Sequence, residues 1–464
     1  MQLLFYILRN IFLIMRRIFK EYIAKTAIII TVKGARIKRK GKKKMCKSKE
    51  SLKEMLYAVY GEGTRNLARF TVLERQLKTE FNAEGAEYFT APGRTEIIGN
   101  HTDHNHGKVL AGSINLDCVG AAAKNGTDTV RILSETFNQK FIISLKDLKP
   151  SAEMAGTIDL TKGILQGFKE KGYEIGGFDA YITSNVISAA GVSSSAAYEM
   201  LICSMLNTFF NGGKMDVVTY SHIGKYSENH FWNKASGLLD QMACAVGGFI
   251  TIDFKNPEKP VVEKIDFDFG AQNYSLVIVN TGKGHADLSA DYSSVPLEMR
   301  KVAAYFGKEA CADITEEDVI REMADVRAYA GDRSVMRALH FFEENKRVEE
   351  QVKALREGDF ETFLQDVTAS GNSSWKWLQN VYTTANVQEQ GISIALALTE
   401  LFIKEKQKGA CRIHGGGFAG VIMVMLPNGL VDEYVEYIEG AIGEGNAYRM
   451  SIRPYGAICV SEKM

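Results

Sequence analysis

Apolar residues recur at helical and strand-like spacings along most of the chain. Leu52, Met55, Leu56 and Val59 fall on one face of a helix, so an amphipathic helix is predicted to begin at Met45. Short runs rich in β-branched and aromatic residues follow and predict strands. These runs lie at Val109–Leu116, Val119–Ala123, Val130–Leu133, Phe141–Leu145 and Phe178–Thr183. The mixture of helical and strand-like runs predicts an α+β or α/β protein.

A second set of elements is predicted from the middle of the chain onward. A helix is expected near Leu160–Lys171 and a longer one at Ser193–Phe210, with Ser193 or Ser194 as its N-cap. Further candidates are a strand at Leu276–Asn280, helices at Glu316–Arg327 and Arg333–Leu355, and a strand at Val421–Leu426. Two prolines between residues 256 and 260 interrupt the pattern. We therefore predict a boundary there, between an N-terminal domain of residues 45–255 and a C-terminal domain of residues 256–464.

The first 44 residues differ from the rest of the chain. They hold 13 lysine and arginine residues but only one acidic residue, Glu21. Basic residues interrupt their apolar runs well before the ~20 residues that a membrane span requires. The apolar stretch also precedes the basic tract, which is the reverse of a secretory signal. We predict that residues 1–44 are a basic and apolar extension outside the fold.

Our hypothesis is that translation begins at Met45. Residues 38–44 (KRKGKKK) are all of types that purine-only codons can encode, as a ribosome-binding leader would be. A peptide from before Lys44 in the natively expressed protein would contradict this hypothesis. The alternative is an amphipathic helix of residues 1–44 that lies on anionic lipid, which vesicle sedimentation would reveal.

Composition excludes several classes of protein. The chain has 464 residues, 45% of them hydrophobic and 7 of them proline, which excludes a disordered or collagen-like chain. Beyond residue 44 there are 43 basic and 55 acidic residues, and so acidic a body is poorly suited to the phosphates of nucleic acid. The seven cysteines are scattered without a C-x-x-C pair, which suits a reducing cytoplasm. We expect a cytoplasmic protein that acts on small molecules, without nucleic acid and without stable membrane association.

Three segments are candidates for carrying the chemistry. Residues 91–107 (APGRTEIIGNHTDHNHG) gather hydroxyl acceptors and an arginine fork in one turn-rich loop, which suits a sugar or a phosphate. Residues 188–197 (SAAGVSSSAA) open a predicted helix, whose free N–H groups attract phosphate. Residues 412–420 (RIHGGGFAG) allow the backbone to approach a ligand closely. The alternative for the first segment is a zinc site at His101, His104 and His106. The alternative for the second is a capped helix behind a tight turn, and for the third a plain hairpin loop.

Taken in this order, the three segments resemble the motifs of the GHMP family of small-molecule kinases, and the first is similar to the signature of the galactokinase family. The family pattern G-R-x-N-x-I-G-E-H-x-D-Y-x-x-G is matched by Gly93, Arg94, Ile98, Gly99, His101, Asp103 and Gly107. The pattern G-L-S-S-S-A is matched by residues 191–196, with Val192 in place of leucine. Residues 228–241 (ENHFWNKASGLLDQ) are similar to E-x-x-F-x-x-x-x-C-G-I-M-D-Q. The resemblance covers about residues 50–460.

The resemblance implies an α+β, two-domain GHMP kinase fold. Its N-terminal part is a ribosomal-protein-S5-like domain that binds sugar and ATP, its C-terminal part is a ferredoxin-like GHMP domain, and the ligands lie in the cleft between them. The implied reaction is ATP-dependent phosphorylation of the anomeric hydroxyl of α-D-galactose to galactose 1-phosphate, with ATP and Mg²⁺ as cofactors.

The resemblance also implies roles for individual residues. Asp240 is the expected catalytic carboxylate, which accepts or orients the hydroxyl proton, and Arg94 steadies both Asp240 and the phosphoryl charge. Replacement of either residue should abolish most turnover. The other implied sites are sugar contacts at Asn100, His101, Asp103, Gly237 and Tyr292; ATP-phosphate contacts at Ala190, Gly191, Val192, Ser193, Ser194, Ser195 and Ala196; Mg²⁺ ligands at Ser195 and Glu228; and the cleft glycines Gly415, Gly416 and Gly417.

The chain departs from the family patterns at several positions beside the expected ligands. Asn100 stands for the glutamate of G-E-H, His104 for the tyrosine of D-Y, and Ala189 and Ala419 for glycines. Asn100 keeps an acceptor, loses the negative charge and adds a donor. A galactose relative with a changed C6 or C2 substituent therefore fits the same argument.

Two alternative functions stay open from the sequence. One is a GHMP kinase for a related sugar, such as N-acetylgalactosamine or a uronic acid, which a panel of sugars would distinguish. The other is a non-catalytic galactose and ATP sensor on the kinase fold. Retention of Arg94, Glu228 and Asp240 argues against the sensor, and detection of any phosphorylated sugar would exclude it.

Overall fold

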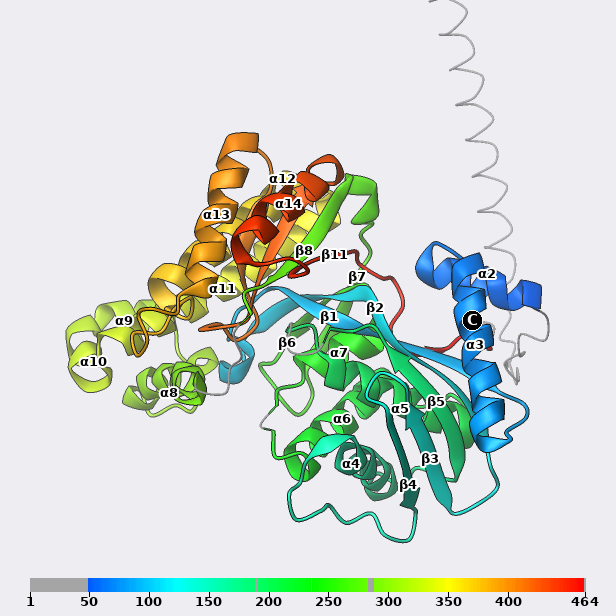
Figure 1. Ribbon diagram of the computed structural model, residues 1–464. Coiled ribbons are helices and arrows are strands. Elements are labelled where there is room, and N and C mark those ends of the chain that lie inside the picture. Colours follow the sequence, from blue (N-terminus) through cyan, green and yellow to red (C-terminus); the bar gives the residue numbers. More distant parts are fainter. Residues whose placement is uncertain (1–48, 188–190, 235, 283–287, 463–464) are drawn as a thin grey trace, which may run out of the picture. The chain divides into compact units, whose positions relative to one another are not determined.

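The computed structural model describes residues 49–187, 191–234, 236–282 and 288–462, which belong to one compact unit. The predicted extension at residues 1–44 lies outside the described residues. Two β-sheets and three groups of helices make up the described part, so the α+β prediction is confirmed (Figure 1). No helix in these ranges is long and apolar enough to cross a membrane.

The larger sheet is built around a long central strand, β2. Its strand order is β12-β1-β2-β5-β3-β4, with β6 paired to another part of β2 and β7 paired to β6. All pairs are antiparallel except β3 with β5. The strands are β1 (Glu87–Ile98), β2 (Lys108–Lys124), β3 (Thr129–Ser134), β4 (Gln139–Ser144), β5 (Phe178–Ser184), β6 (Phe249–Asp253), β7 (Val261–Ile265) and β12 (Ile458–Cys459).

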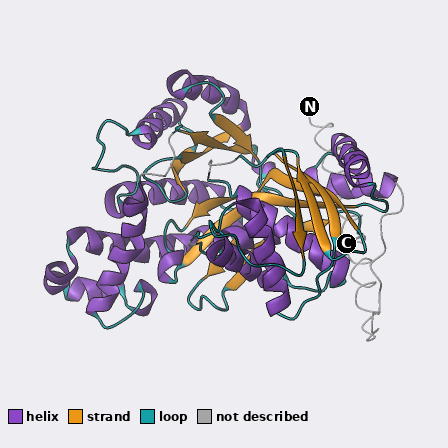
Figure 2. Cartoon of the chain, turned by 60° about the horizontal axis from the view of Figure 1, so that its bottom comes forward, coloured by secondary structure: helices purple, strands orange, loops and turns teal. Residues whose placement is uncertain are grey.

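Helices cover both faces of this sheet because side chains along β2 alternate between them (Figure 2). Val119, Ala121 and Ala123 face α2 and α3, whereas Cys118 and Ala122 belong to the core on the side of α5. The predicted face of α2, with Leu52, Leu56 and Val59 buried, is confirmed. The helices are α2 (Lys49–Tyr60), α3 (Thr64–Phe81), α4 (Gly156–Glu170), α5 (Ser194–Phe210), α6 (Val217–Phe231) and α7 (Leu239–Val246).

The smaller sheet has the order β11-β8-β10-β9 and is antiparallel throughout. Its strands are β8 (Tyr274–Asn280), β9 (Ala410–His414), β10 (Val421–Pro427) and β11 (Ala447–Met450). Alternate residues of β8 and β10 face α13 and α14, and the others join the core of the larger sheet. The helices beside it are α12 (Phe360–Ser373), α13 (Gly391–Lys406) and α14 (Val431–Ile442).

A third group of helices is arranged around the long helix α11. The group consists of α8 (Ser289–Tyr305), α9 (Glu316–Arg321), α10 (Met323–Ala330) and α11 (Asp332–Glu357). Val295 and Met299 of α8 pack with Ala338 and Phe341 of α11 in one apolar cluster. The short helical turns are η1 (Asp103–Asn105), η2 (Gly270–Gln272), η4 (Cys311–Asp313), η5 (Ser374–Leu378) and η6 (Asn428–Leu430).

Three local predictions were wrong. The two strands predicted at Val109–Leu116 and Val119–Ala123 are one strand, because the polar Asp117 between them is buried against Arg69 and Arg453 and does not end it. The helix predicted at Glu316–Arg327 is two helices that meet at Glu322, and this break brings α10 against both α8 and α11. Residues 91–98, predicted as part of a turn-rich loop, belong to strand β1. Ser193 occupies the predicted N-cap position of α5, although its hydroxyl donates to Asp240 and makes no cap hydrogen bond.

The larger sheet draws strands from both ends of the chain. β7 lies beyond the predicted boundary at residue 256 and pairs with β6, and β12 at the C-terminal end pairs with β1. The division into residues 45–255 and 256–464 stays a prediction. The strand that carries Arg94 is thus held on one edge by the last strand of the chain.

Candidate active site

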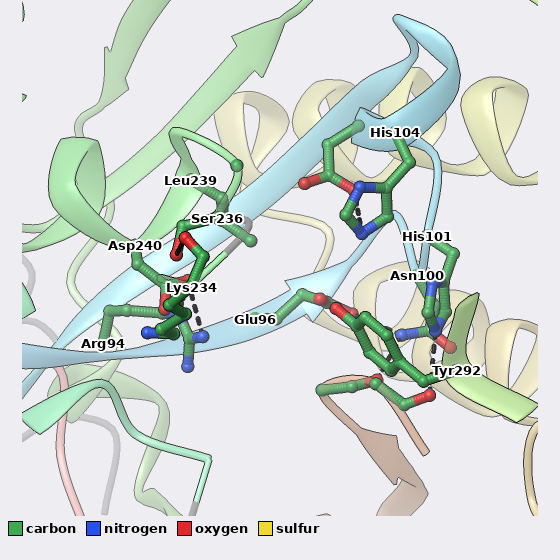
Figure 3. A pocket seen from close by; sticks show the side chains of 14 residues that line it. Arg94, Glu96, Asn100, His101, His104, Lys234, Ser236, Leu239, Asp240 and Tyr292 are labelled. Carbon is green, nitrogen blue, oxygen red and sulfur yellow. Dashed lines mark hydrogen bonds and ion pairs between the residues drawn. The ribbon is translucent and has the colours of Figure 1, made fainter. Parts of the chain in front are cut away.

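A pocket lies where β1, the turn at η1, the loop before α7, the start of α8 and the glycine loop between β9 and β10 meet. Figure 3 shows Arg94, Lys234 and Asp240 together at one side of it, and Asn100, His101 and Tyr292 at the other. The structure therefore brings together predicted site residues that are up to 322 positions apart in the chain.

Arg94 and Asp240 form an ion pair in this pocket. The Arg94 Nε donates to Asp240 Oδ1 at 2.8 Å, and its Nη2 lies 2.6 Å from the same oxygen. Burial opposes ionisation of Asp240, but the charges of Arg94 and Lys234 outweigh it and hold the pKa of this carboxyl below its ordinary value. Asp240 lies in the first turn of α7, where the helix dipole also favours an anion. An ionised acceptor is thus fixed beside a guanidinium.

The serine-rich loop reaches the same ion pair. Arg94 donates through Nη1 to the carbonyl of Gly191, and its backbone N–H donates to the carbonyl of Val192 at 3.1 Å. Gly191 and Ser193 both have positive φ, and for Ser193 this conformation is unusual and strained. Its hydroxyl donates to Asp240 Oδ2. The predicted contact at Ala190 lies outside the described residues.

The predicted Mg²⁺ ligands also meet. Ser195, in the first turn of α5, donates to Glu228 Oε1 at 2.8 Å. Lys234 Nζ lies 2.6 Å from the same oxygen and 3.3 Å from the Ser195 hydroxyl. Gln241 Nε2 donates to Glu228 Oε2 and to the neighbouring Glu199, whose pKa is raised well above its ordinary value by burial and by Glu228. A carboxylate, a hydroxyl and a lysine ammonium group therefore lie together at the start of α5.

Ser195 and Glu228 suit a Mg²⁺ ion that is also bound by water and phosphate, and not a metal ion held by protein side chains alone. Within the described part of the chain, no three histidine, cysteine, aspartate or glutamate side chains are arranged to hold a metal ion. The interpretation of His101, His104 and His106 as a zinc site therefore finds no support there. Mg²⁺ commonly takes one or two carboxylates and completes its shell with water and substrate phosphates, which is what adjacent Ser195 and Glu228 oxygens offer.

The predicted sugar contacts line the other side of the pocket. Asp103 begins η1, and Gly237 lies against it; a Cβ at Gly237 would stand 2.9 Å from Asp103 Oδ2. His101 donates from Nε2 to the carbonyl of Gly416 at 2.8 Å, and burial lowers its pKa to about 3, so its ring is neutral. Tyr292 is 41% exposed and its ring packs against that of His101. This side offers a carboxylate and two rings to a polar ligand.

The glycine loop is shaped by close approaches. A Cβ at Gly416 would stand 2.1 Å from the Tyr292 ring, and one at Gly417 would stand 2.2 Å from the carbonyl of Asn380. Gly415 and Gly417 have positive φ. The loop therefore needs glycine at 416 and 417 for space, and at 415 and 417 for backbone conformation.

Glu96, Lys234 and His414 were not among the predicted site residues. Glu96 and Lys234 line the pocket, and His414 lies behind it with Nε2 accepting from the backbone N–H of Glu96 at 3.2 Å. Burial lowers the pKa of His414 well below its ordinary value, so the ring is neutral. Glu96 lies two positions after Arg94 on the same strand, and that spacing was the signal that could have identified it.

The chain is similar in sequence to known kinases. The family described as "Galactokinase galactose-binding signature" matches residues 76–124, and "GHMP kinases N terminal domain" matches residues 159–248. A galactokinase from Clostridium perfringens is 30% identical over 386 residues, covering 80% of this chain and 93% of that protein. A galactokinase from Clostridium tetani is 28% identical over 373 residues, covering 79% and 91%.

Solved structures share the fold. The structure of Lactococcus lactis galactokinase complexed with galactose superposes with a TM-score of 0.71 at 24% identity, covering 84% of this chain and all of that one. A mevalonate kinase superposes with a TM-score of 0.54 at 15% identity, covering 79% and 99%. The predicted GHMP kinase fold is therefore confirmed.

Proposed function

Because the chain belongs to the galactokinase family, we propose that its pocket transfers the terminal phosphoryl group of ATP to the anomeric hydroxyl of α-D-galactose, giving galactose 1-phosphate and ADP. The observation that carries this proposal for the pocket is the Arg94–Asp240 ion pair, which touches both the serine-rich loop and the polar side of the pocket. Phosphoryl transfer needs positioning and charge neutralisation above all, and this arrangement supplies both.

In the proposed mechanism, Asp240 accepts the proton of the attacking hydroxyl or orients it. The pKa of Asp240 lies below its ordinary value, so the carboxylate is ionised at neutral pH and is ready to accept a hydrogen bond. Arg94 holds Asp240 in place and faces the developing charge of the phosphoryl oxygens. The free N–H groups at the start of α5 and the loop ending at Ser193 would hold the nucleotide phosphates.

Ser195 and Glu228 are the residues that would hold Mg²⁺ beside these phosphates. When bound, the ion would neutralise phosphate charge. Lys234 lies between this pair and Asp240, and the Glu228 and Asp240 charges raise its pKa against the opposing effect of burial, so it stays cationic. We infer that Lys234 also faces the phosphates and leaves Glu228 when they arrive.

The sugar would lie against Asp103, His101 and Tyr292, with Gly237 leaving room for the Asp103 carboxylate. A related sugar is the second candidate, because position 100 carries an amide where the family pattern has a carboxylate. We propose a cytoplasmic location on the cysteine pattern, since the six cysteines in the described ranges are all free and buried.

The test is ADP release by the full chain with ATP, Mg²⁺ and a panel of galactose, N-acetylgalactosamine, galacturonic acid and glucose. We expect galactose to give the highest kcat/KM and the reaction to stop when the metal is chelated. If another sugar gives the highest kcat/KM, that sugar and not galactose is the substrate. If the protein is folded and none of these sugars leads to ADP release, the kinase proposal is refuted.

A further inference from the structure

Asn100 has no hydrogen-bonding capacity left for a ligand. One amide hydrogen of its Nδ2 is donated to Glu96 Oε1 at 3.0 Å, and the other to the carbonyl of Gly415 at 2.7 Å. Its Oδ1 accepts from Asn380 Nδ2 at 2.7 Å and from the Ser374 hydroxyl at 3.5 Å. The residue is 1% exposed. A side-chain amide has two donors, and both are used within the protein.

Glu96 is in the opposite situation. Its Oε1 accepts from Asn100 and from Arg412 Nη2, both at 3.0 Å, whereas Oε2 accepts no hydrogen bond from any described residue. The side chain lines the pocket, and Figure 3 shows it between the Arg94–Asp240 pair and the ring of Tyr292. One oxygen is therefore anchored and the other is available to a ligand.

The two residue types have exchanged positions relative to the family pattern. That pattern, G-R-x-N-x-I-G-E-H, has asparagine where this chain has Glu96 and glutamate where it has Asn100. The exchanged side chains touch each other here, so the chain keeps one carboxylate and one amide in the pocket wall but presents the carboxylate from β1.

We propose that Glu96 is the specificity-determining carboxylate of this pocket, whose Oε2 accepts a hydrogen bond from a hydroxyl of the sugar other than the anomeric one. Asn100 is a positioning residue that fixes Glu96 through Oε1. Arg94 and Glu96 are two residues apart on one strand, so their side chains leave the same face about 7 Å apart, and Glu96 addresses a hydroxyl other than the one that is phosphorylated. The inference rests on the proposed function for the identity of the ligand as a sugar.

The test compares the wild type and Glu96→Gln with galactose and its 2-, 3-, 4- and 6-deoxy forms, by calorimetric binding and by kcat/KM. Glutamine keeps the shape and removes the charge. We expect galactose binding to weaken at least tenfold, since hydrogen bonds to a charged acceptor are the stronger kind. The wild type and the variant should bind one deoxy sugar equally, namely the one that lacks the hydroxyl facing Glu96.

Glu344→Gln is the matched control. Glu344 is also buried, and it accepts the backbone N–H groups of Gly99 and Asn100, but it does not line the pocket. Its replacement should change the binding of every sugar by the same factor. An equal loss for all five sugars in Glu96→Gln, or no loss for galactose, would overturn the inference while leaving galactose phosphorylation by the wild type intact. A wild type that neither binds nor phosphorylates any of the five would overturn both proposals.

The positioning role of Asn100 predicts non-additivity. Asn100→Ala should raise the KM for galactose with little change in kcat, and the double variant Asn100→Ala with Glu96→Gln should be no weaker than Glu96→Gln alone. Losses that multiply in the double variant would show that Asn100 acts independently of Glu96, and would overturn this role.

Discussion

Replacement of Asp240 by asparagine tests the centre of the proposed mechanism. The change keeps the volume of the side chain and one oxygen that can accept from Arg94 Nε, but it removes the charge that the Arg94 guanidinium and Lys234 face. The amide cannot accept the proton of the sugar hydroxyl.

The surroundings of Asp240 allow an estimate of the loss of stability and of the loss of turnover in this variant. Loss of one partner of a fully buried ion pair costs about 3–5 kcal/mol. The Asp240 side chain is 27% exposed and asparagine retains one hydrogen bond, so we expect a loss of about 2 kcal/mol in the free energy of unfolding. Loss of a general base lowers turnover by about 10² to 10⁴. The variant should thus stay folded and be nearly inactive.

Coupled ADP release at saturating galactose measures kcat, and urea unfolding measures stability. Asp253→Asn is a suitable control, because Asp253 pairs with Lys108 at 3.6 Å outside the pocket and its loss should leave kcat unchanged. Retention of more than a tenth of the wild-type kcat by Asp240→Asn would refute the role of this carboxylate.

Two further predictions concern the supports of the pocket. Burial raises the pKa of Glu344, but His340, Arg347 and Arg412 lower it more, to about 2. Ionised Glu344 therefore contributes its full share to the free energy of unfolding above the unfolded-state pKa near 4.5, and this contribution is lost as the pH falls toward 2. Glu344→Gln should cost about 3 kcal/mol at pH 7, and urea titrations should show the difference from wild type shrinking between pH 4.5 and 2, whereas a constant difference would contradict this explanation. Gly416→Ala should raise the KM for galactose at least tenfold by displacing Tyr292. The control is Gly440→Ala in α14, whose added Cβ meets no atom within 4 Å, and equal KM values in the two variants would count against Tyr292 as a sugar contact.

The sequence predicted the catalytic pair through the resemblance and not through spacing. Arg94 and Asp240 are 146 residues apart, and no periodicity joins a strand residue to a carboxylate at the start of a distant helix. Once the motifs were matched, the convergence of Arg94, Asp240 and the serine-rich loop followed. Polar residues inside strands were harder to assign from the sequence. The sequence predicts a break between two strands at Asp117, because its buried partners Arg69 and Arg453 are distant in the chain.

The hydrogen bonds of the Asn100 side chain could not be predicted from the sequence. Its partners Asn380 and Gly415 lie 280 and 315 positions away, so nothing local indicated that its amide would be used up within the protein. Glu96 was missed because the sequence placed it in a turn-rich loop, whereas it lies on strand β1, two positions after Arg94. Only the fold of the smaller sheet against β1, which brings Arg412 to Glu96, makes that carboxylate part of the pocket wall.

The pairing of β12 with β1 has a consequence for truncated forms of the protein. Phe89 and Thr90, just ahead of Arg94, bond to Cys459 and Ile458, and the N–H of Val460 donates to the carbonyl of Tyr88 at 2.8 Å. Without β12, this edge of β1 would present unpaired N–H and C=O groups, which are a template for pairing with another chain. A variant truncated before Ile458 should therefore aggregate instead of behaving as a slightly shorter enzyme, because the strand that carries the arginine would have an open edge.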